Sequence, residues 1–321
     1  MAVRWLGAAA VVADDDGWQH FYRVDPEDRP FSADADLWAK LRMPVGIRAV
    51  FRTSAGLLEL AVLAGQDCSP VDVVVDGTLA HRLPVSPGES TLRAPLPGRP
   101  VQVEVWLPQY GAFSIQEPVL IGGDATPAVE TGLTWITYGS SISQCRGAAG
   151  PSETWPALVA RRRGWQLTCL GIAGQCHLDP VIARTIRHTP ADLISLCLGI
   201  NIYTDVTFNR RSLQPHVAGF VQTIRDQQTE PPIAVVTAIR CPRFEGVRNA
   251  AGMTPDDVRH EVAEAVAALT AVGDKNLHLV DGLTLFGPEE AERFLPDGLH
   301  PSADGYRVLA ERMATALSGV R

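Results

Sequence analysis

The chain has 321 residues, enough for two domains of unequal size, and 46% of them are hydrophobic and 20% charged. The formal net charge of -8 argues against a nucleic acid or an anionic membrane surface as partner, because either needs a basic face. No segment is long and apolar enough to cross a bilayer, and the six cysteines form no CxxC pair. We therefore predict no membrane span, no metal site and no cofactor.

The N-terminal segment imitates a signal peptide. Arg4 precedes an apolar run that extends to Ala13, but the stretch is shorter than a usual secretory signal and has one basic residue. A first β-strand that ends at the turn Asp14-Asp15-Asp16-Gly17 explains the same residues. Because several cysteines lie inside apolar runs, where unpaired thiols behave as small hydrophobes, we expect a cytoplasmic protein.

Up to about residue 122, short β-type runs alternate with turn residues. Strands are predicted at 45–51, 57–63, 71–75 and 101–107, and Asp76-Gly77 predicts a hairpin turn because glycine accepts a positive φ. No helix is predicted in this region. The pattern indicates an antiparallel β-sandwich, which we place at residues 1–125.

After a linker-like stretch at 122–127 the rhythm changes. Apolar strands are predicted at 133–138, 167–170, 193–198, 233–239 and 277–280, and helices at 155–163, 181–187, 216–227, 258–272 and 303–317. This alternation indicates an α/β domain over residues 131–321, with a parallel sheet covered on both faces. Ligands of such sheets bind at the carboxyl ends of the strands.

Polar residues follow those carboxyl ends. Ser141 lies at the strand-to-helix turn after the first strand, where unpaired N–H groups can hold a developing negative charge. Gly174 follows the second strand and Asn201 the third. Read alone, Ser141 is more often a helix-capping serine, and the other two are ordinary loop or cap residues.

Asp297 and His300 lie three residues apart just before the last predicted helix. The carboxylate can hold the Nδ1–H of the imidazole, which leaves Nε2 to take a proton from a serine. Such a pair alone also fits a helix cap or two metal ligands. Together with Ser141, Gly174 and Asn201, in this order, it predicts a serine-dependent acyl-transfer enzyme.

These blocks resemble those of the SGNH, or GDSL, family of serine esterases and acyltransferases. Gly139-Ser140-Ser141-Ile142 resembles the GDSL block, with Ser140 in place of the usual Asp, and Gly174, Gly199-Ile200-Asn201 and Asp297-Gly298-Leu299-His300 match the other three blocks. The resemblance covers residues 131–321. It implies a flavodoxin-like three-layer α/β/α domain in which Ser141 attacks, His300 is the base, and Ser141, Gly174 and Asn201 form the oxyanion hole. Cys169 stands where relatives often have Asn, so a supporting hydrogen bond is in doubt.

The whole chain resembles a subset of that family in which a jelly-roll-like β-sandwich precedes the SGNH domain. The segment Trp106-Leu107-Pro108-Gln109-Tyr110 is typical of this subset, whose members act on sugars or polyketides. The resemblance implies a small-molecule acyl donor and a hydroxyl acceptor, and we consider Tyr203, His177 and Trp155 as candidates for substrate contact. Two alternatives stay open: a carbohydrate O-acetyl esterase, and an inactive SGNH scaffold that serves as a ligand-binding module.

Overall fold

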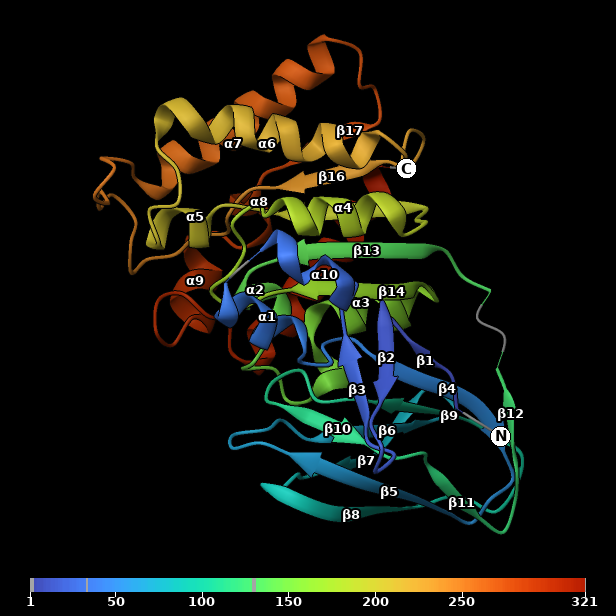
Figure 1. Ribbon diagram of the computed structural model, residues 1–321. Coiled ribbons are helices and arrows are strands. Elements are labelled where there is room, and N and C mark those ends of the chain that lie inside the picture. The colour runs from blue at the N-terminus through green and yellow to red at the C-terminus, as the bar shows by residue number, and fades with distance from the viewer. Residues whose placement is uncertain (1–2, 33, 129–130, 321) are drawn as a thin grey trace.

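The computed structural model describes residues 3–32, 34–128 and 131–320. Antiparallel sheets occupy the N-terminal part of the chain, and a parallel sheet with helices on both faces occupies the rest (Figure 1). The fold class is therefore the one expected, an α/β domain with a parallel sheet after an antiparallel sandwich. No helix among the described residues is long and apolar enough to span a membrane.

The sandwich consists of two six-stranded sheets. The first has the order β1-β4-β9-β6-β7, with β12 also on β4: β1 (Trp5–Leu6), β4 (Arg48–Thr53), β9 (Val101–Trp106), β6 (Val71–Val75), β7 (Thr78–Leu83) and β12 (Ala125–Pro127). The second has the order β11-β5-β10-β3-β2, with β8 also on β5: β11 (Val119–Ile121), β5 (Leu57–Ala64), β10 (Phe113–Ile115), β3 (Gln19–Tyr22), β2 (Ala10–Ala13) and β8 (Gly88–Pro95). Alternate residues of β5 are buried, as expected for a strand with one face on a core.

The predicted hairpin at Asp76-Gly77 is present. Both residues have positive φ, 47° and 78°, and they join the antiparallel strands β6 and β7. The predicted first strand is divided, because Gly7, at φ 84°, separates β1 from β2. Since β12 pairs with β4, the first sheet extends to Pro127. The domain boundaries at 125 and 131 stay a prediction.

The expectation of a helix-free N-terminal region was wrong. A 3-10 helix, η1 (Pro26–Phe31), and helix α1 (Ala35–Leu41) follow β3, and the side chain of Asp34 caps α1 by accepting the Leu37 N–H at 2.8 Å. The buried side chains of α1 pack in the core of the α/β part rather than in the sandwich. A helix of only seven residues carries too short an apolar stripe to be distinguished from a loop by periodicity.

The parallel sheet has the order β14-β13-β15-β16-β17, which is the flavodoxin-like order 2-1-3-4-5. Its strands are β13 (Thr134–Gly139), β14 (Gln166–Gly171), β15 (Leu193–Cys197), β16 (Ile233–Val236) and β17 (Leu277–Val280). The fourth strand ends at Val236 rather than at the predicted Ile239, so the residues after it form a loop at the carboxyl edge.

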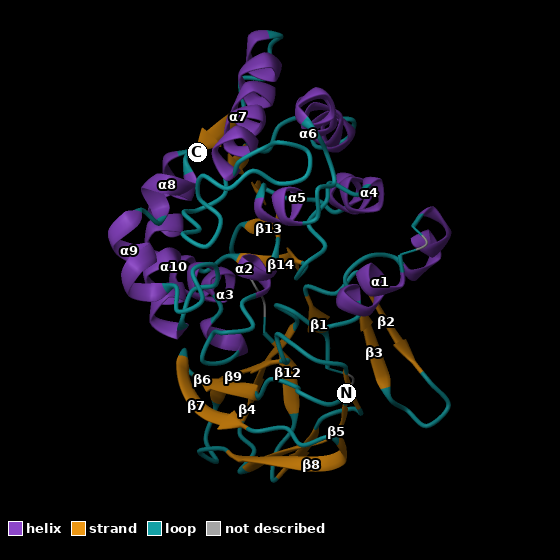
Figure 2. Ribbon diagram, turned by 90° about the vertical axis from the view of Figure 1, so that its left-hand side faces the viewer, coloured by secondary structure: helices purple, strands orange, loops and turns teal. Residues whose placement is uncertain are grey.

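Two layers of helices cover this sheet, as the turned view shows (Figure 2). One layer contains α3 (Trp155–Arg163), α8 (Gly282–Leu285), α9 (Pro288–Phe294) and α10 (Ala303–Gly319). The other contains α4 (Pro180–His188), α5 (Ile200–Thr204), α6 (Arg210–Arg225) and α7 (Pro255–Ala271). Two short elements complete the chain, α2 (Ser141–Gln144) and the 3-10 helix η2 (Pro151–Glu153).

The edge strand β14 faces the sandwich (Figure 1). Two buried arginines of the N-terminal part donate to carbonyl groups along its open edge: Arg48 Nη1 to Leu167 O at 3.0 Å, and Arg23 Nη1 to Cys169 O and Gly171 O at 3.1 and 2.7 Å. An open strand edge invites pairing with other chains unless its polar groups are covered. The sandwich part therefore covers the open edge of the parallel sheet.

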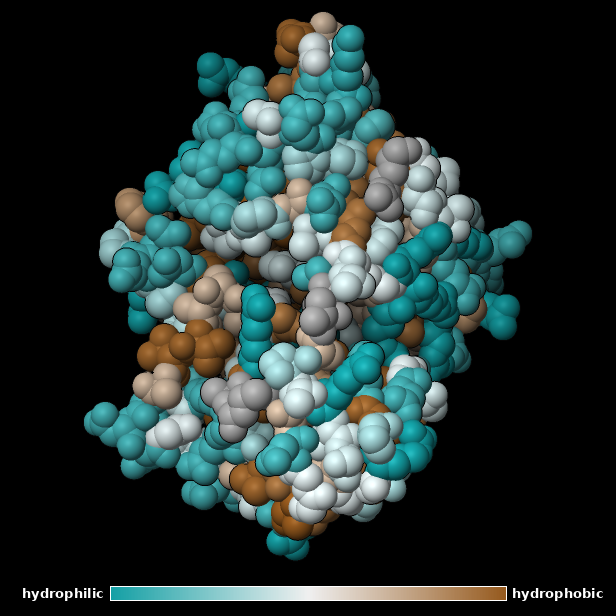
Figure 3. All heavy atoms as spheres, turned by 90° about the vertical axis from the view of Figure 1, so that its right-hand side faces the viewer, coloured by the Kyte–Doolittle hydropathy of each residue, from teal (hydrophilic) through white to brown (hydrophobic). Residues whose placement is uncertain are grey.

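The face drawn in Figure 3 is mostly hydrophilic, and its hydrophobic residues occur in small separate groups. Scattered apolar residues of this kind are normal on a protein surface. Exposed examples in the chain include Val119 at 53% and Ile121 at 47% on the short strand β11. The face shown in Figure 3 therefore gives no sign of a broad apolar docking surface.

Candidate active site

The serine predicted as nucleophile is the first residue of α2, at the carboxyl end of β13, which lies between β14 and β15. The helix cap is its neighbour Ser140, whose Oγ accepts the Ile142 N–H at 3.3 Å, so the hydroxyl of Ser141 is left for other contacts. Gly171 allows β14 to pass close to α2, because a Cβ there would lie 2.5 Å from the Gln144 nitrogen. The turn thus presents a half-buried serine above the sheet.

A chain of hydrogen bonds links Asp297, His300 and Ser141. The Oγ of Ser141 lies 2.9 Å from His300 Nε2, and His300 Nδ1 lies 2.7 Å from Asp297 Oδ2. Because an ionised carboxylate only accepts, Nδ1 carries the proton and Nε2 accepts from the serine hydroxyl. The structure therefore brings together the three residues in the arrangement that activates a serine.

Asp297 is held in its charged form. Burial by itself would raise its pKa, but the N–H groups of His300 and Leu299, at 2.7 and 2.9 Å from Oδ1, and the imidazole outweigh burial and hold the pKa at about 2. The loop is supported by the segment after β16, where the Arg243 N–H donates to Gly298 O at 3.2 Å. The carboxylate is thus ionised throughout the neutral range.

Three donors predicted for an oxyanion hole have no acceptor among the described residues: the N–H of Ser141, the N–H of Gly174 and the side-chain amide of Asn201. Asn201 Oδ1 accepts the Cys176 N–H at 3.2 Å, which fixes the amide and leaves its Nδ2 hydrogens available. Gly174 adopts a φ of 73°, a conformation that favours glycine. All three follow the carboxyl ends of strands, Ser141 after β13, Gly174 after β14 and Asn201 after β15.

Two side chains hold the peptide groups on either side of the Gly174 N–H. Gln144 Oε1 accepts the Ala173 N–H at 2.8 Å, and His177 Nε2 lies 3.0 Å from Gly174 O. His177 is itself placed by Thr207, whose Oγ1 lies 2.8 Å from Nδ1. Sequence reasoning missed Gln144. Its N–H and carbonyl partners are main-chain groups, which give no signal in the sequence.

The sandwich part reaches the same loops. Gln144 Nε2 donates to Gln109 O at 3.2 Å, and Gln175 Nε2 donates to Asp36 Oδ2 at 2.9 Å. Arg23 lacks a carboxylate partner among the described residues. Burial lowers the pKa of the Arg23 guanidinium to about 10, so the group is still charged at neutral pH. It donates to the carbonyl of Gly171, where β14 ends and the loop that contains Gly174 begins. The sequence contained no signal for Arg23, because its acceptors are main-chain carbonyls.

The residues considered for substrate contact have defined structural partners. Trp155 is 1% exposed and donates its indole N–H to Ile142 O at 3.0 Å, below the nucleophile turn. Tyr203 is 4% exposed, and its hydroxyl donates to Val247 O at 3.1 Å. His177 supports Gly174 as described above. Contact of these residues with substrate stays a prediction.

The nearby cysteines are poor competitors of Ser141. Burial raises the pKa of Cys197 to about 12, and it raises the pKa of Cys241 to about 12 as well. A thiol attacks as the thiolate, so both are inert at neutral pH. Cys169 Sγ lies 3.7 Å from Ser143 O, a weak contact.

The model of the GDSL-like lipase/acylhydrolase family matches residues 136–308. Among solved structures, the chain is similar to the salicylyl-acyltransferase SsfX3 from a tetracycline biosynthetic pathway, with 33% identity and a TM-score of 0.91 over 99% of this chain and 95% of that one. A comparison of the sequence with curated proteins gave no match.

Two further structures share the fold at lower identity. A putative GDSL-like lipase from Bacteroides ovatus has 19% identity and a TM-score of 0.81, covering 99% of this chain and 96% of that one. A family two carbohydrate esterase from Clostridium thermocellum has 12% identity and a TM-score of 0.74, covering 99% and 98%. At these identities the likeness concerns the fold alone.

Proposed function

The chain belongs to the GDSL-like lipase/acylhydrolase family, and from that membership and its site we propose that Ser141 carries an acyl group from a small-molecule donor to a hydroxyl acceptor. The protein is a GDSL-family serine esterase/acyltransferase. The observation that carries the residue assignment is the hydrogen-bond chain from Asp297 through His300 to Ser141.

In the first half-reaction, Ser141 Oγ attacks the acyl carbonyl of the donor ester while His300 Nε2 takes the serine proton. The carbonyl oxygen becomes an oxyanion, which the N–H groups of Ser141 and Gly174 and the Asn201 amide stabilise. The bond from the carbonyl carbon to the leaving oxygen then breaks, and His300 returns its proton to that oxygen. Asp297 stays ionised and stabilises the imidazolium.

In the second half-reaction, a hydroxyl takes the place of the leaving group. His300 removes the proton of the acceptor hydroxyl, whose oxygen attacks the acyl carbon and releases Ser141 with its proton restored. Water in this role gives hydrolysis, and an alcohol gives transfer. We favour an alcohol of a small natural product, a polyketide or a sugar. The similarity over nearly the whole chain to a salicylyl-acyltransferase from a tetracycline biosynthetic pathway supports this choice.

A charged rim next to the catalytic loops also supports a polar acceptor. Arg146, just after α2, is ion-paired with Asp67 of the sandwich and lies over the Tyr110 ring at 4.2 Å. The adjacent Gly147 approaches Pro301, the residue after His300. Residues of both parts of the molecule therefore meet where an acceptor would approach His300.

We further infer a cytoplasmic site of action and no nucleic-acid partner. All six cysteines are free, and four of them are buried, which fits a reducing compartment. The net charge of -8 disfavours binding to a polyanion.

A competition assay tests transfer against hydrolysis. The acyl-enzyme formed from p-nitrophenyl acetate is offered sugar or polyphenol alcohols at millimolar concentration in water. A transferase yields acetylated alcohol far beyond the alcohol's share of the hydroxyl groups in solution. A product ratio that follows that share would leave a hydrolase, of which a carbohydrate O-acetyl esterase is the second candidate.

A further inference from the structure

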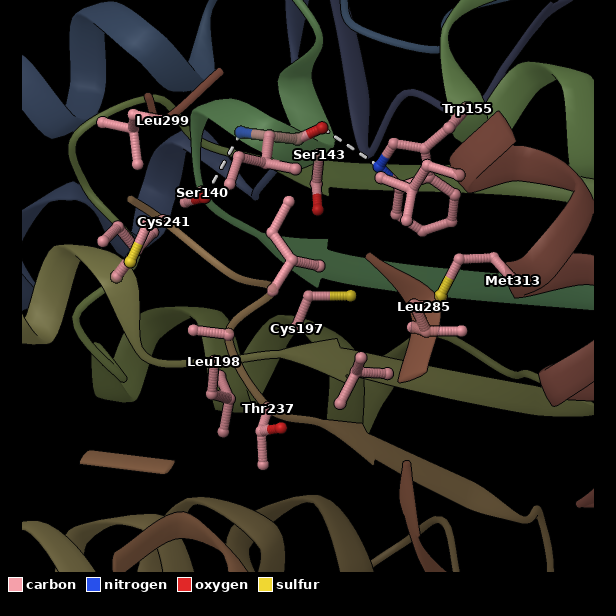
Figure 4. A pocket seen from close by; sticks show the side chains of 16 residues that line it. Ser140, Ser143, Trp155, Cys197, Leu198, Thr237, Cys241, Leu285, Leu299 and Met313 are labelled. Atoms are coloured by element: carbon pink, nitrogen blue, oxygen red, sulfur yellow. Dashed lines mark hydrogen bonds between the residues drawn. The ribbon is translucent and has the colours of Figure 1, made fainter. Parts of the chain in front are cut away.

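An apolar cavity lies below the nucleophile turn, between the carboxyl end of the parallel sheet and the helices α8 and α10 (Figure 4). About 40 Å³ of it is open to the centres of water-sized molecules. One water needs roughly 10–15 Å³ by this measure, so the space has room for a small group and not for a long chain. Its walls include Ile142, Trp155, Cys197, Leu285, Leu299 and Met313.

The cavity borders the immediate neighbours of the catalytic groups. Ile142 follows the nucleophile, Leu299 precedes His300, and Ile200 precedes Asn201. Ile142 and Leu299 are partly exposed, so this end lies near the surface at the active site. Met313 at the far end is 1% exposed. In Figure 4, Ser143 and Cys197 project into the space between these two ends.

The polar atoms in the wall are largely engaged by the protein. Thr237 Oγ1 accepts the Gly282 N–H at 2.9 Å, and the Trp155 indole N–H is held by Ile142 O at 3.0 Å. None of the described residues that line the cavity is charged. A charged or hydroxyl-rich ligand would lose its hydration here without compensation, whereas a hydrocarbon group would gain from burial.

In the acyl-transfer reaction at Ser141, only one substituent of the reacting carbon is a hydrocarbon group that could enter this cavity. Around the tetrahedral carbon, the oxyanion points to its donors, and the leaving or entering oxygen points to His300. The exposed ion pair of Arg146 with Asp67 can form hydrogen bonds to a polar acceptor. The substituent that is left is the carbon chain of the acyl group, and the apolar cavity beside Ile142 and Leu299 matches it.

We propose that this cavity binds the acyl group carried by Ser141 and selects a short aliphatic acyl chain. The inference rests on the proposed acyl-enzyme and adds the class of acyl group to it. Wild-type kcat/KM is then highest for acetyl or butyryl esters and falls steeply toward octanoyl esters.

Met313→Ala tests the proposal, because it lengthens the far end of the cavity without touching the catalytic residues. The ratio of kcat/KM for p-nitrophenyl hexanoate to that for p-nitrophenyl acetate should rise about tenfold, the lower range of discrimination expected for one or more methylenes in a fitted pocket. Met253→Ala is the matched control, since Met253 is equally buried at 1% but lines no part of this cavity. An equal ratio in the two variants would overturn the proposal.

A binding experiment separates this inference from the acyl-enzyme mechanism. In a Ser141→Ala background, which cannot form the ester, ethyl butyrate and ethyl hexanoate are titrated against tryptophan fluorescence. Adding Met313→Ala should tighten ethyl hexanoate about tenfold relative to ethyl butyrate, whether or not Ser141 is the nucleophile. Unchanged relative affinities would refute the acyl pocket and leave the proposed function standing.

Discussion

The sandwich and the α/β part differ in how they serve the site. The α/β part carries all the predicted catalytic groups, in the segments after β13, β14 and β15 and in the loop between α9 and α10. The sandwich part supplies none of them. It contacts η2, through Asp72 with Ser152 and Arg82 with Glu153, and it also contacts the edge strand β14 and the loop that follows it. One part therefore carries the proposed reacting groups, and the other also holds the strand that leads to Gly174, the proposed oxyanion donor.

This division has a physical basis. Parallel sheets place functional loops at one edge by topology, but they leave the carbonyls of an edge strand without partners. Arg23 and Arg48 satisfy those carbonyls along β14. The sandwich part thus supports the edge of the parallel sheet through these two side chains. We expect removal of this support to displace the loop that contains Gly174 more than Ser141 or His300.

The largest effect is expected within the α/β part. Asp297→Asn removes the carboxylate that fixes the His300 tautomer, and the corresponding change in serine triads lowers kcat by about 10,000-fold. Steady-state hydrolysis of p-nitrophenyl acetate measures it. Asp304→Asn is the control, because Asp304 is exposed in the first turn of α10 and pairs only with Arg307 among the described residues. A loss below about tenfold in Asp297→Asn would contradict the role of this carboxylate.

Asn201→Ala is expected to be next in size. Removing one oxyanion donor typically lowers kcat by about 100- to 1,000-fold while KM changes little. Asn201→Asp, which keeps the shape and the acceptor of the Cys176 N–H, separates donation from packing. A rise in KM with kcat unchanged would place Asn201 in substrate binding instead.

The contribution of the sandwich part to catalysis is tested by replacing each of the two arginines that contact β14, one near either end of the strand, with methionine. Arg23→Met and Arg48→Met both leave carbonyls of the strand without a donor, and both should lower the midpoint of thermal unfolding. Only Arg23→Met should also lower kcat, by about tenfold, because Gly171 leads into the Gly174 loop. Equal kcat values in the two folded variants would break the proposed link between sandwich and oxyanion hole.

The smallest effect concerns acid stability. The lowered pKa of Asp297, about 2, means that its contribution to folding is present above the usual carboxyl pKa of about 4 and is lost as the pH falls toward 2. The stability difference between wild type and Asp297→Asn should therefore shrink between about pH 4 and pH 2. Urea unfolding at a series of pH values measures it. A difference that persists unchanged at pH 2 would contradict the lowered pKa.

Activity responds to pH elsewhere. A histidine base must be neutral to take the serine proton, so kcat/KM should fall on the acid side of the pH profile. A profile flat down to pH 5 would argue against His300 as the base.

The sequence predicted the positions of Ser141, Gly174 and Asn201 because continuous apolar runs mark buried parallel strands, and these residues come just after them. It also predicted the Asp297–His300 contact, which is local and needs only a tight loop. The supporting contacts could not be predicted. Gln144 and Arg23 bond to main-chain groups, which every residue has, and partners of that kind leave no trace in a single sequence.

Helix α1 was missed for a related reason. It has only seven residues, too few for a helical period to be recognised in the sequence. Its apolar residues pack against the α/β part, and a single sequence gives no sign of such a distant contact.

Mass spectrometry of the protein after reaction with a fluorophosphonate tests the central claim most directly. The account predicts one adduct per chain, located on the peptide that contains Ser141, and labelling that becomes at least about 1,000-fold slower in His300→Ala. An adduct on another residue, or labelling of a Ser141→Ala protein at the wild-type rate, would contradict it.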